Sequence, residues 1–255
     1  MSSARAMIQS PAWPAREAGP GGRTVHIESA PTAEPNMDAT LSALVRVVEE
    51  AAGDNPWALV GAASARMQGV EAPSPNLEFI TTSTTSEQLA EMLGLDARWL
   101  AGRQLAAQRL HFLRDSVPVF VFGDAQFQGR YDALSPRDIP ALWDARMRLS
   151  CGGVTVMATP LEWELLLAVV LDNTERASEI ARVLRGREWD GRLLTRLMRE
   201  GHVHAATEQA VWQLLEQGGP RLAPAARART GDESAADGES VLDPDGAPDA
   251  HEDGE

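Results

Sequence analysis

The sequence predicts an α/β (α+β) fold, a mixed β-sheet with flanking helices and a C-terminal helical extension. The first observation behind this prediction is the order of its patterned segments: helix, strand, helix, strand, helix, then strands and finally helices. The second is a hydrophobic share of 44% in 255 residues, which is ordinary for a chain with a buried core. The third is the length of the patterned part, residues 38–219, which suits one compact domain with a helical appendage.

The first half of this body predicts three helices and two strands. Apolar residues recur at helical spacing over 39–52, so this segment is predicted to be a helix. Trp57–Val60 is a short apolar strand that is broken at Gly61, and the small residues after it predict a helix over 62–68. A strand over 76–82, with Asn76, Glu78 and Ile80 on one face, precedes a helix over 86–93.

The second half predicts two hairpins and then a run of helices. Strands over 109–113 and 117–122 are joined by the turn residues Asp115 and Ser116, and a second pair of strands covers 146–150 and 154–158. Ser135–Pro136 begins a helix between the first and the second of these hairpins. A capping box of Thr159 and Glu162 is expected to open an apolar helix that runs to Leu171. Further helices are predicted over 174–185, 190–199 and 205–217, and the sheet is expected to hold four or five strands with its helices on one side.

The formal charge of -14 is concentrated at the C-terminal end. Residues 232–255 hold ten carboxylates and no Arg, and subtracting them leaves -4 for the rest of the chain. We therefore expect a disordered acidic tail over 220–255 and, from its Pro and Gly content, a disordered leader over 1–37. Between them lie a domain over 38–172 and a helical extension over 173–219. The tail is either a lure for a basic partner, an internal mimic of nucleic acid or a solubilising appendage.

Composition excludes several classes of protein. All 23 basic residues are Arg, so the chain has no lysine Schiff base, lysine general base or P-loop lysine. Cys151 is the only cysteine, which excludes an intramolecular disulfide and fits a reducing cytoplasm. The sequence has no apolar run long enough for a membrane helix. The interleaved acids and the acidic tail argue against a nucleic-acid partner for the Arg-rich helical end.

Residues 57–80 contain the arrangement that points to chemistry. A hydrophobic strand ends at Gly61-Ala62, a short helix and a Pro-containing loop follow, and Asn76 and Glu78 lie two apart on the next strand. Together with the strand and helix at 154–171, this order resembles the nucleotidyltransferase superfamily, particularly its minimal bacterial members. The resemblance spans roughly residues 40–200.

The resemblance implies a site for a nucleoside triphosphate and Mg²⁺. Gly61 and Ala62 would cradle the triphosphate through their backbone amides. Asn76 and Glu78 would be the catalytic pair that holds magnesium, because carboxylates two apart on a strand point the same way and can share divalent metals. The reaction would transfer a nucleotide to an acceptor and release pyrophosphate.

The chain departs from the family pattern at several of these positions. Asn76 is neutral where the family has a carboxylate, and Ala62 has no hydroxyl. A third carboxylate usually comes from a later central strand, but that strand, 117–122, offers Phe120 and Phe122, with Asp124 just past its expected end. Two hypotheses follow: a nucleotide-binding protein whose magnesium-dependent transfer is weak or lost, or an inactive module that binds a protein partner. His111 is either a catalytic base or a sheet residue without a chemical role.

Overall fold

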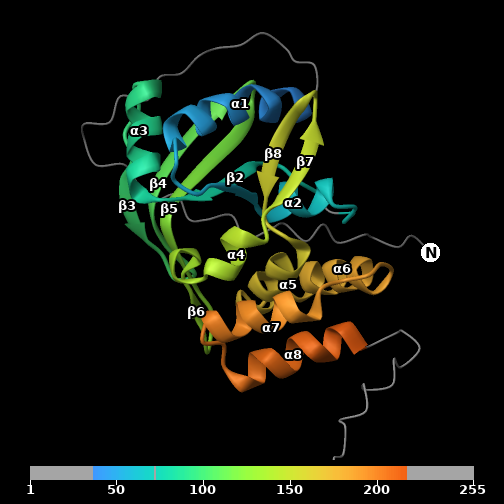
Figure 1. Ribbon diagram of the computed structural model, residues 1–255. Coiled ribbons are helices and arrows are strands. Elements are labelled where there is room, and N and C mark those ends of the chain that lie inside the picture. The colour runs from blue at the N-terminus through green and yellow to red at the C-terminus, as the bar shows by residue number, and fades with distance from the viewer. Residues whose placement is uncertain (1–36, 72, 217–255) are drawn as a thin grey trace, which may run out of the picture.

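The structure is a computed structural model that describes residues 37–216 except residue 72. Figure 1 shows its helices, which are α1 (Met37–Ala52), α2 (Gly61–Met67), α3 (Ser83–Leu93), η1 (Pro136–Asp138), α4 (Pro140–Asp144), α5 (Leu161–Val170), α6 (Thr174–Arg185), α7 (Gly191–Glu200) and α8 (Ala205–Glu216). The strands are β1 (Ala58–Val60), β2 (Leu77–Thr81), β3 (Arg98–Ala101), β4 (Leu105–Arg114), β5 (Val117–Gln128), β6 (Ala133–Leu134), β7 (Met147–Cys151) and β8 (Val154–Ala158). The predicted leader and tail lie outside the described residues, apart from Met37 at the start of α1.

The strands form one mixed sheet in the order β3-β4-β5-β2-β1-β8-β7, with β6 paired to β5. β2 runs parallel to β5 and β1 runs parallel to β8, while the other pairs are antiparallel. The predicted mixed sheet is confirmed, but the expectation of four or five strands is wrong, since the sheet has eight. The strands that sequence pattern missed are β3 and β6, which are four and two residues long and show no alternation of apolar and polar residues.

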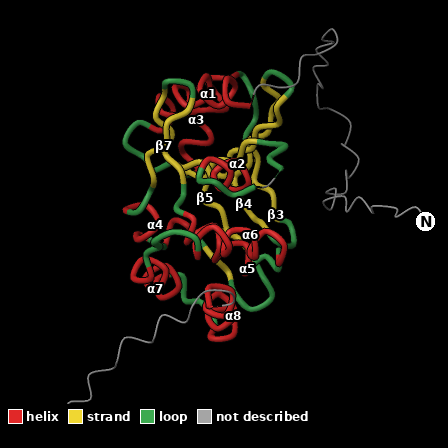
Figure 2. Tube along the Cα trace, turned by 90° about the vertical axis from the view of Figure 1, so that its right-hand side faces the viewer, coloured by secondary structure: helices red, strands yellow, loops and turns green. Residues whose placement is uncertain are grey.

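Helices cover both faces of the sheet, so the expectation of helices on one side is also wrong (Figures 1 and 2). α1 and α3 pack on one face with Leu59, Phe79 and Val121. The other face meets α5, whose Trp163 is fully buried and packs edge-on against Phe127 of β5. The two cores exist because alternate residues of the central strands point to opposite faces and both sets are apolar.

The C-terminal helices α6, α7 and α8 continue the second of these cores. Ile180, Leu194 and Val211 are fully buried in the same apolar cluster as Trp163. Asn173 caps α6 and Asp190 caps α7, each accepting a backbone N–H with its side chain. The predicted helical extension is therefore a layer packed on the domain. None of the described helices has the length and apolarity needed to cross a membrane.

The expected capping box at the start of α5 does not form. Pro160 is the N-cap residue of this helix, and no side chain caps it. Glu162 instead accepts the backbone N–H of Asp190 at 3.0 Å, before α7. Thr159 hydrogen-bonds a different acid, Glu164. The local pattern Thr-x-x-Glu was correct for a helix start, but longer-range partners took both side chains.

Candidate functional site

Gly61 stands at the junction between β1 and α2 in a conformation that favours glycine. Its φ is +87°, in the left-handed region. The pairing of β1 with β2 sets Val60 opposite Glu78. A Cβ atom at position 61 would lie 2.3 Å from Oε2 of Glu78, closer than any real contact. Any other residue at position 61 would therefore be strained by its positive φ and would force the end of the Glu78 side chain to move.

The structure brings together the four residues that the resemblance singled out. Asn76 immediately precedes β2, and its Nδ2 donates to Oε1 of Glu78 at 3.1 Å. Ala62 is half-buried in the first turn of α2, next to Gly61. Gly61, the first residue of α2, lies against the side chain of Glu78 on β2. Their roles in binding triphosphate and magnesium stay predictions.

A second carboxylate, Glu164 of α5, lies at the same point and was not singled out from the sequence. Its side chain is 0% exposed. The backbone N–H of Gly61 donates to its Oε1 at 2.9 Å, and the hydroxyl of Thr159 donates to the same oxygen at 2.5 Å. Arg176 of α6 pairs with its other oxygen. The amide that would cradle a phosphate is thus occupied by a side chain of the protein itself.

Both carboxyl groups are held in an environment that opposes their ionisation. Burial raises the pKa of Glu78, and the nearby Glu164 adds to this, while Arg176 and Asn76 act in the opposite direction. Burial likewise raises the pKa of Glu164, against Arg176, Thr159 and the amide of Gly61. Two carboxyl groups therefore share one guanidinium, and Arg176 pairs directly with Glu164 alone.

The raised pKa of Glu78 predicts a stability that falls as pH rises. The unfolded chain releases this proton near pH 4.5, the ordinary value, whereas the folded protein retains it to higher pH. Between those two values unfolding releases a proton, so the folded state loses stability as pH increases. Glu78→Gln removes this loss, and the variant should gain stability relative to the parent between pH 4 and pH 8. Urea denaturation across that range measures it.

The matched control for this measurement is Glu71→Gln, which changes an exposed glutamate shortly before the same strand. Its stability should follow that of the parent at every pH. A stability difference between Glu78→Gln and the parent that stays constant from pH 4 to pH 8 would contradict the assignment.

The position beside Glu78 on the next strand holds a ring instead of an acid. Phe120 of β5 is the direct partner of Glu78 in the sheet and of His111 on β4. The rings of His111 and Phe120 stack with centroids 4.5 Å apart, and the guanidinium of Arg109 lies 5.4 Å from the centre of the Phe120 ring. Burial and the adjacent Arg109 lower the pKa of His111, which favours its neutral form. This face of the sheet is therefore aromatic and cationic.

Asp124, expected just past the end of its strand, lies inside β5, which continues to Gln128. It has a positive φ of 46° and accepts a hydrogen bond from Ser83 at the start of α3. Arg137 lies 4.0 Å away. These contacts direct the carboxylate to Ser83 and Arg137.

The residues at this site do not fit a magnesium ion. Mg²⁺ requires a near-octahedral set of oxygen ligands, preferably anionic. The predicted pair supplies one carboxyl group, Glu78, whose raised pKa disfavours its charged form, and one amide whose nitrogen faces that carboxyl. Glu164 is already bound to Arg176 and Gly61. Across residues 37–216, no group of three or more His, Cys, Asp or Glu side chains could hold a metal.

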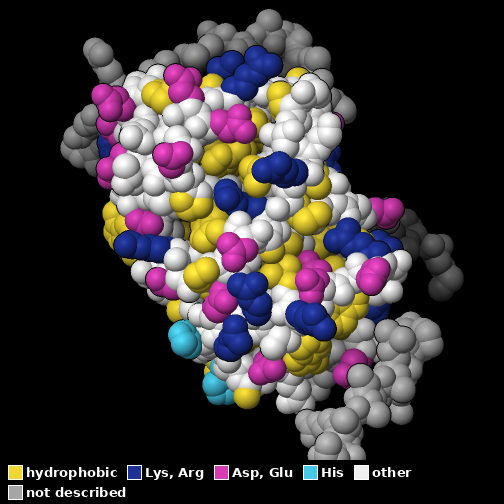
Figure 3. All heavy atoms as spheres, viewed as in Figure 1, with side chains coloured by type: hydrophobic (Ala, Val, Ile, Leu, Met, Phe, Trp, Pro, Cys, Tyr) yellow, Lys and Arg dark blue, Asp and Glu magenta, His cyan; other side chains and the backbone are white. Residues whose placement is uncertain are grey.

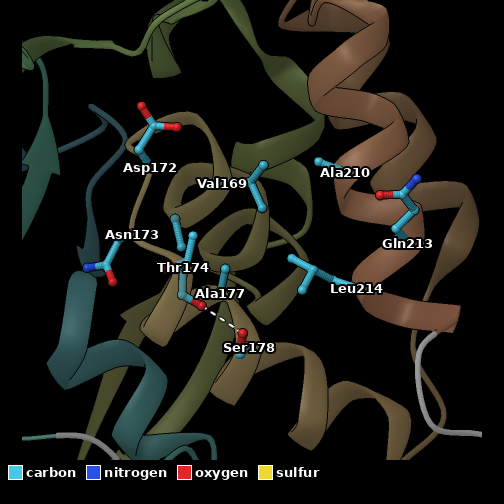
Figure 4. Close-up of a pocket in the computed structure, with 10 residues that line it drawn as sticks. Val169, Asp172, Asn173, Thr174, Ala177, Ser178, Ala210, Gln213 and Leu214 are labelled. Atoms are coloured by element: carbon cyan, nitrogen blue, oxygen red, sulfur yellow. Dashed lines mark hydrogen bonds between the residues drawn. The ribbon is translucent and has the colours of Figure 1, made fainter.

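Two cavities of the described body have linings that do not include Glu78. One of about 290 Å³ lies between α5, α6 and α8, where Figure 4 shows Val169 and Leu214 projecting toward the space between the helices. Its polar groups serve the helices themselves, since Ser178 donates to the carbonyl of Thr174 and Asn173 caps α6. A smaller cavity of about 130 Å³ adjoins Thr81 and Asp124. Neither contains a pair of groups suited to acid–base chemistry with Glu78.

Several solved structures have a related arrangement of helices and strands at low sequence identity. A protein from Thermotoga maritima assigned as a nucleotidyltransferase is 16% identical, with a TM-score of 0.45 over 59% of this chain and 96% of its own. A nucleotidyltransferase-like antigenic protein from Paracoccidioides brasiliensis is 12% identical, with a TM-score of 0.38 over 72% and 95% of the two chains. The antibiotic-resistance factor ANT(2'')-Ia is 15% identical, with a TM-score of 0.36 over 70% and 91%.

No protein-family model and no curated protein matches the sequence. Two of the three structures are described as nucleotidyltransferases or nucleotidyltransferase-like proteins, the family that the Gly61–Glu78 motif resembles. At 12–16% identity, this likeness concerns the general arrangement of the fold. The chemistry of this site is therefore argued from the residues of this chain.

Proposed function

We propose that the protein is a nucleotidyltransferase-like protein that has lost magnesium-dependent nucleotide transfer and acts by binding a partner. The observation that carries this proposal is the hydrogen bond from the amide of Gly61 to Glu164. A triphosphate at this amide would have to displace a fully buried carboxylate and break its pair with Arg176. Removing one member of a buried ion pair costs about 3–5 kcal/mol, and this opposes nucleotide binding at Gly61.

The proposal predicts that no nucleotide transfer occurs with magnesium and nucleoside triphosphates. Pyrophosphate release should not exceed that of the double variant Asn76→Ala/Glu78→Ala, which removes both predicted ligands. The two proteins are compared at equal concentration, with each of the four common triphosphates and with manganese in place of magnesium. Release by the parent that rises with metal concentration and disappears in the double variant would overturn the proposal.

A second candidate function is nucleotide binding without transfer, and the face formed by Arg109, His111 and Phe120 favours it. A cation stacked on an aromatic ring suits a ligand with a planar base and a phosphate. Thermal unfolding with nucleotide but without metal tests this function. A rise in Tm that Arg109→Ala abolishes would support it. Arg130→Ala is the control of equal charge, because Arg130 lies over the exposed ring of Tyr131 instead.

A further inference from the structure

The edge strand β3 exposes apolar and basic side chains at one end of the sheet. Trp99 is 53% exposed and Leu100 is 46% exposed. Within the described part of the chain, β3 pairs with β4 alone, so its outer backbone groups have no strand partner there. Figure 3 shows hydrophobic and basic side chains next to each other at the left-hand edge of the molecule, where β3 lies in Figure 1. Such an edge favours the addition of another strand.

The hairpin of β3 and β4 is uniformly basic. Residues 98–114 contain four Arg and no Asp or Glu. Arg103 in the turn forms no ion pair with any residue that the structure describes, whereas Arg98 pairs with Asp96 just before the strand at 3.2 Å. An extended segment that pairs with this edge would therefore gain from acidic residues at its two ends.

The apolar residues of β3 impose a second requirement on such a segment. Trp99 pairs with Gln108 and Leu100 with Ala107, and consecutive residues of a strand point to opposite faces of the sheet. An added strand therefore has to bring one apolar side chain to each face. Two adjacent apolar residues meet this condition, but apolar residues that alternate with polar ones do not.

The acidic end of the chain contains one segment that meets both requirements. Glu239-Ser-Val-Leu-Asp243 has Val241 and Leu242 adjacent, with an acid at each end, and Pro244 follows. These two are the only large apolar residues among 232–255. The 22 residues between Glu216 and Glu239 span up to about 75 Å when extended, more than the ~40 Å across a body of this size. The segment can therefore reach β3 of its own chain.

We propose that residues 239–243 dock on the edge of β3 as an added strand of the same molecule. The acidic tail would then serve as an internal partner that covers an exposed edge, which goes beyond a solubilising role. This inference does not depend on whether the site at Gly61 and Glu78 transfers nucleotide, because it involves a different edge of the sheet.

Hydrogen exchange of the β3 amides in the full chain tests the docking. The outward-facing amides among residues 98–101 should exchange at least about tenfold more slowly in the parent than in Val241→Asp/Leu242→Asp. The matched control, Val241→Leu/Leu242→Val, keeps one apolar side chain for each face and should preserve the protection. Salt should reduce the protection in the parent and in the control variant, since the ends of the segment pair through exposed charges.

Two results would overturn the proposal. Equal exchange in the parent and in the aspartate double variant would show that Val241 and Leu242 do not cover β3. Protection that increases with protein concentration, together with a dimer in sedimentation, would show that a second copy covers the edge instead. Metal-dependent pyrophosphate release by the parent would overturn the proposed function but would affect neither of these results, so failure of the proposed function is separable from failure of this inference.

Discussion

Replacement of Glu164 by alanine is expected to lower the free energy of unfolding by about 3–5 kcal/mol, because it breaks a buried pair by removing one partner. The guanidinium of Arg176 would lose its counterion, and the amide of Gly61 and the hydroxyl of Thr159 would lose their acceptor. Each unpaired buried group adds its desolvation penalty. Urea denaturation monitored by circular dichroism measures the change.

Three variants separate the charge of Glu164 from its size and position. Glu164→Gln keeps an acceptor for Gly61 and Thr159, so its loss of stability should be smaller than that of Glu164→Ala. Glu164→Leu/Arg176→Met replaces both charges and should recover part of the stability. Glu175→Ala, at an exposed position on α6, is the control and should change stability by no more than about 0.5 kcal/mol. A change that small in Glu164→Ala would contradict the ion pair described here.

Replacement of Gly61 by alanine is the second change with a large expected effect, about 2–4 kcal/mol of destabilisation. The left-handed conformation costs an L-residue about 1–2 kcal/mol. The added methyl group would also overlap Oε2 of Glu78, and the backbone or that side chain would have to shift. The shift would in turn strain the hydrogen bond from the amide of Gly61 to Glu164.

Gly69→Ala is a closely matched control for this substitution. Its φ of +91° is nearly that of Gly61, but a Cβ there meets no atom within 4 Å. It should therefore show the conformational cost alone, about 1–2 kcal/mol. The excess in Gly61→Ala should shrink in the background of Glu78→Ala, which removes the overlapping oxygen, and a double-mutant cycle measures this coupling. Equal losses in Gly61→Ala and Gly69→Ala would contradict the close approach of Glu78.

Local pattern was sufficient for most helices and for the central strands. The predicted helix over 174–185 agrees with α6 residue for residue, and the strand over 154–158 agrees with β8. Both have a strong apolar periodicity and clear ends, which neighbours in sequence decide. The edge strand β3 was not predicted, since four exposed residues carry no such periodicity and their pairing with β4 alone makes them a strand.

The residues of the candidate site likewise divide into those that the sequence identified and one that only the tertiary structure revealed. Gly61, Asn76 and Glu78 were singled out together because the strand, short helix and second strand that hold them resemble the nucleotidyltransferase motif. Glu164 was not predictable, although it accepts the hydrogen bond of the Gly61 amide. It lies 103 residues from Gly61 and 12 from Arg176, within an apolar helix where an acid in the first turn is ordinary.

Short-range order along this chain therefore specifies its helices, its central strands and the glycine beside a carboxylate. Packing of α5 and α6 against the sheet decides which group accepts the hydrogen bond of the Gly61 amide. Gly61 and Glu164 are 103 residues apart, so this hydrogen bond exists only when the whole core has formed. The periodicity that predicts α5 as a helix is the same whether Glu164 faces solvent or the amide of Gly61. Only the position of α5 on the sheet places its carboxylate at the amide of Gly61.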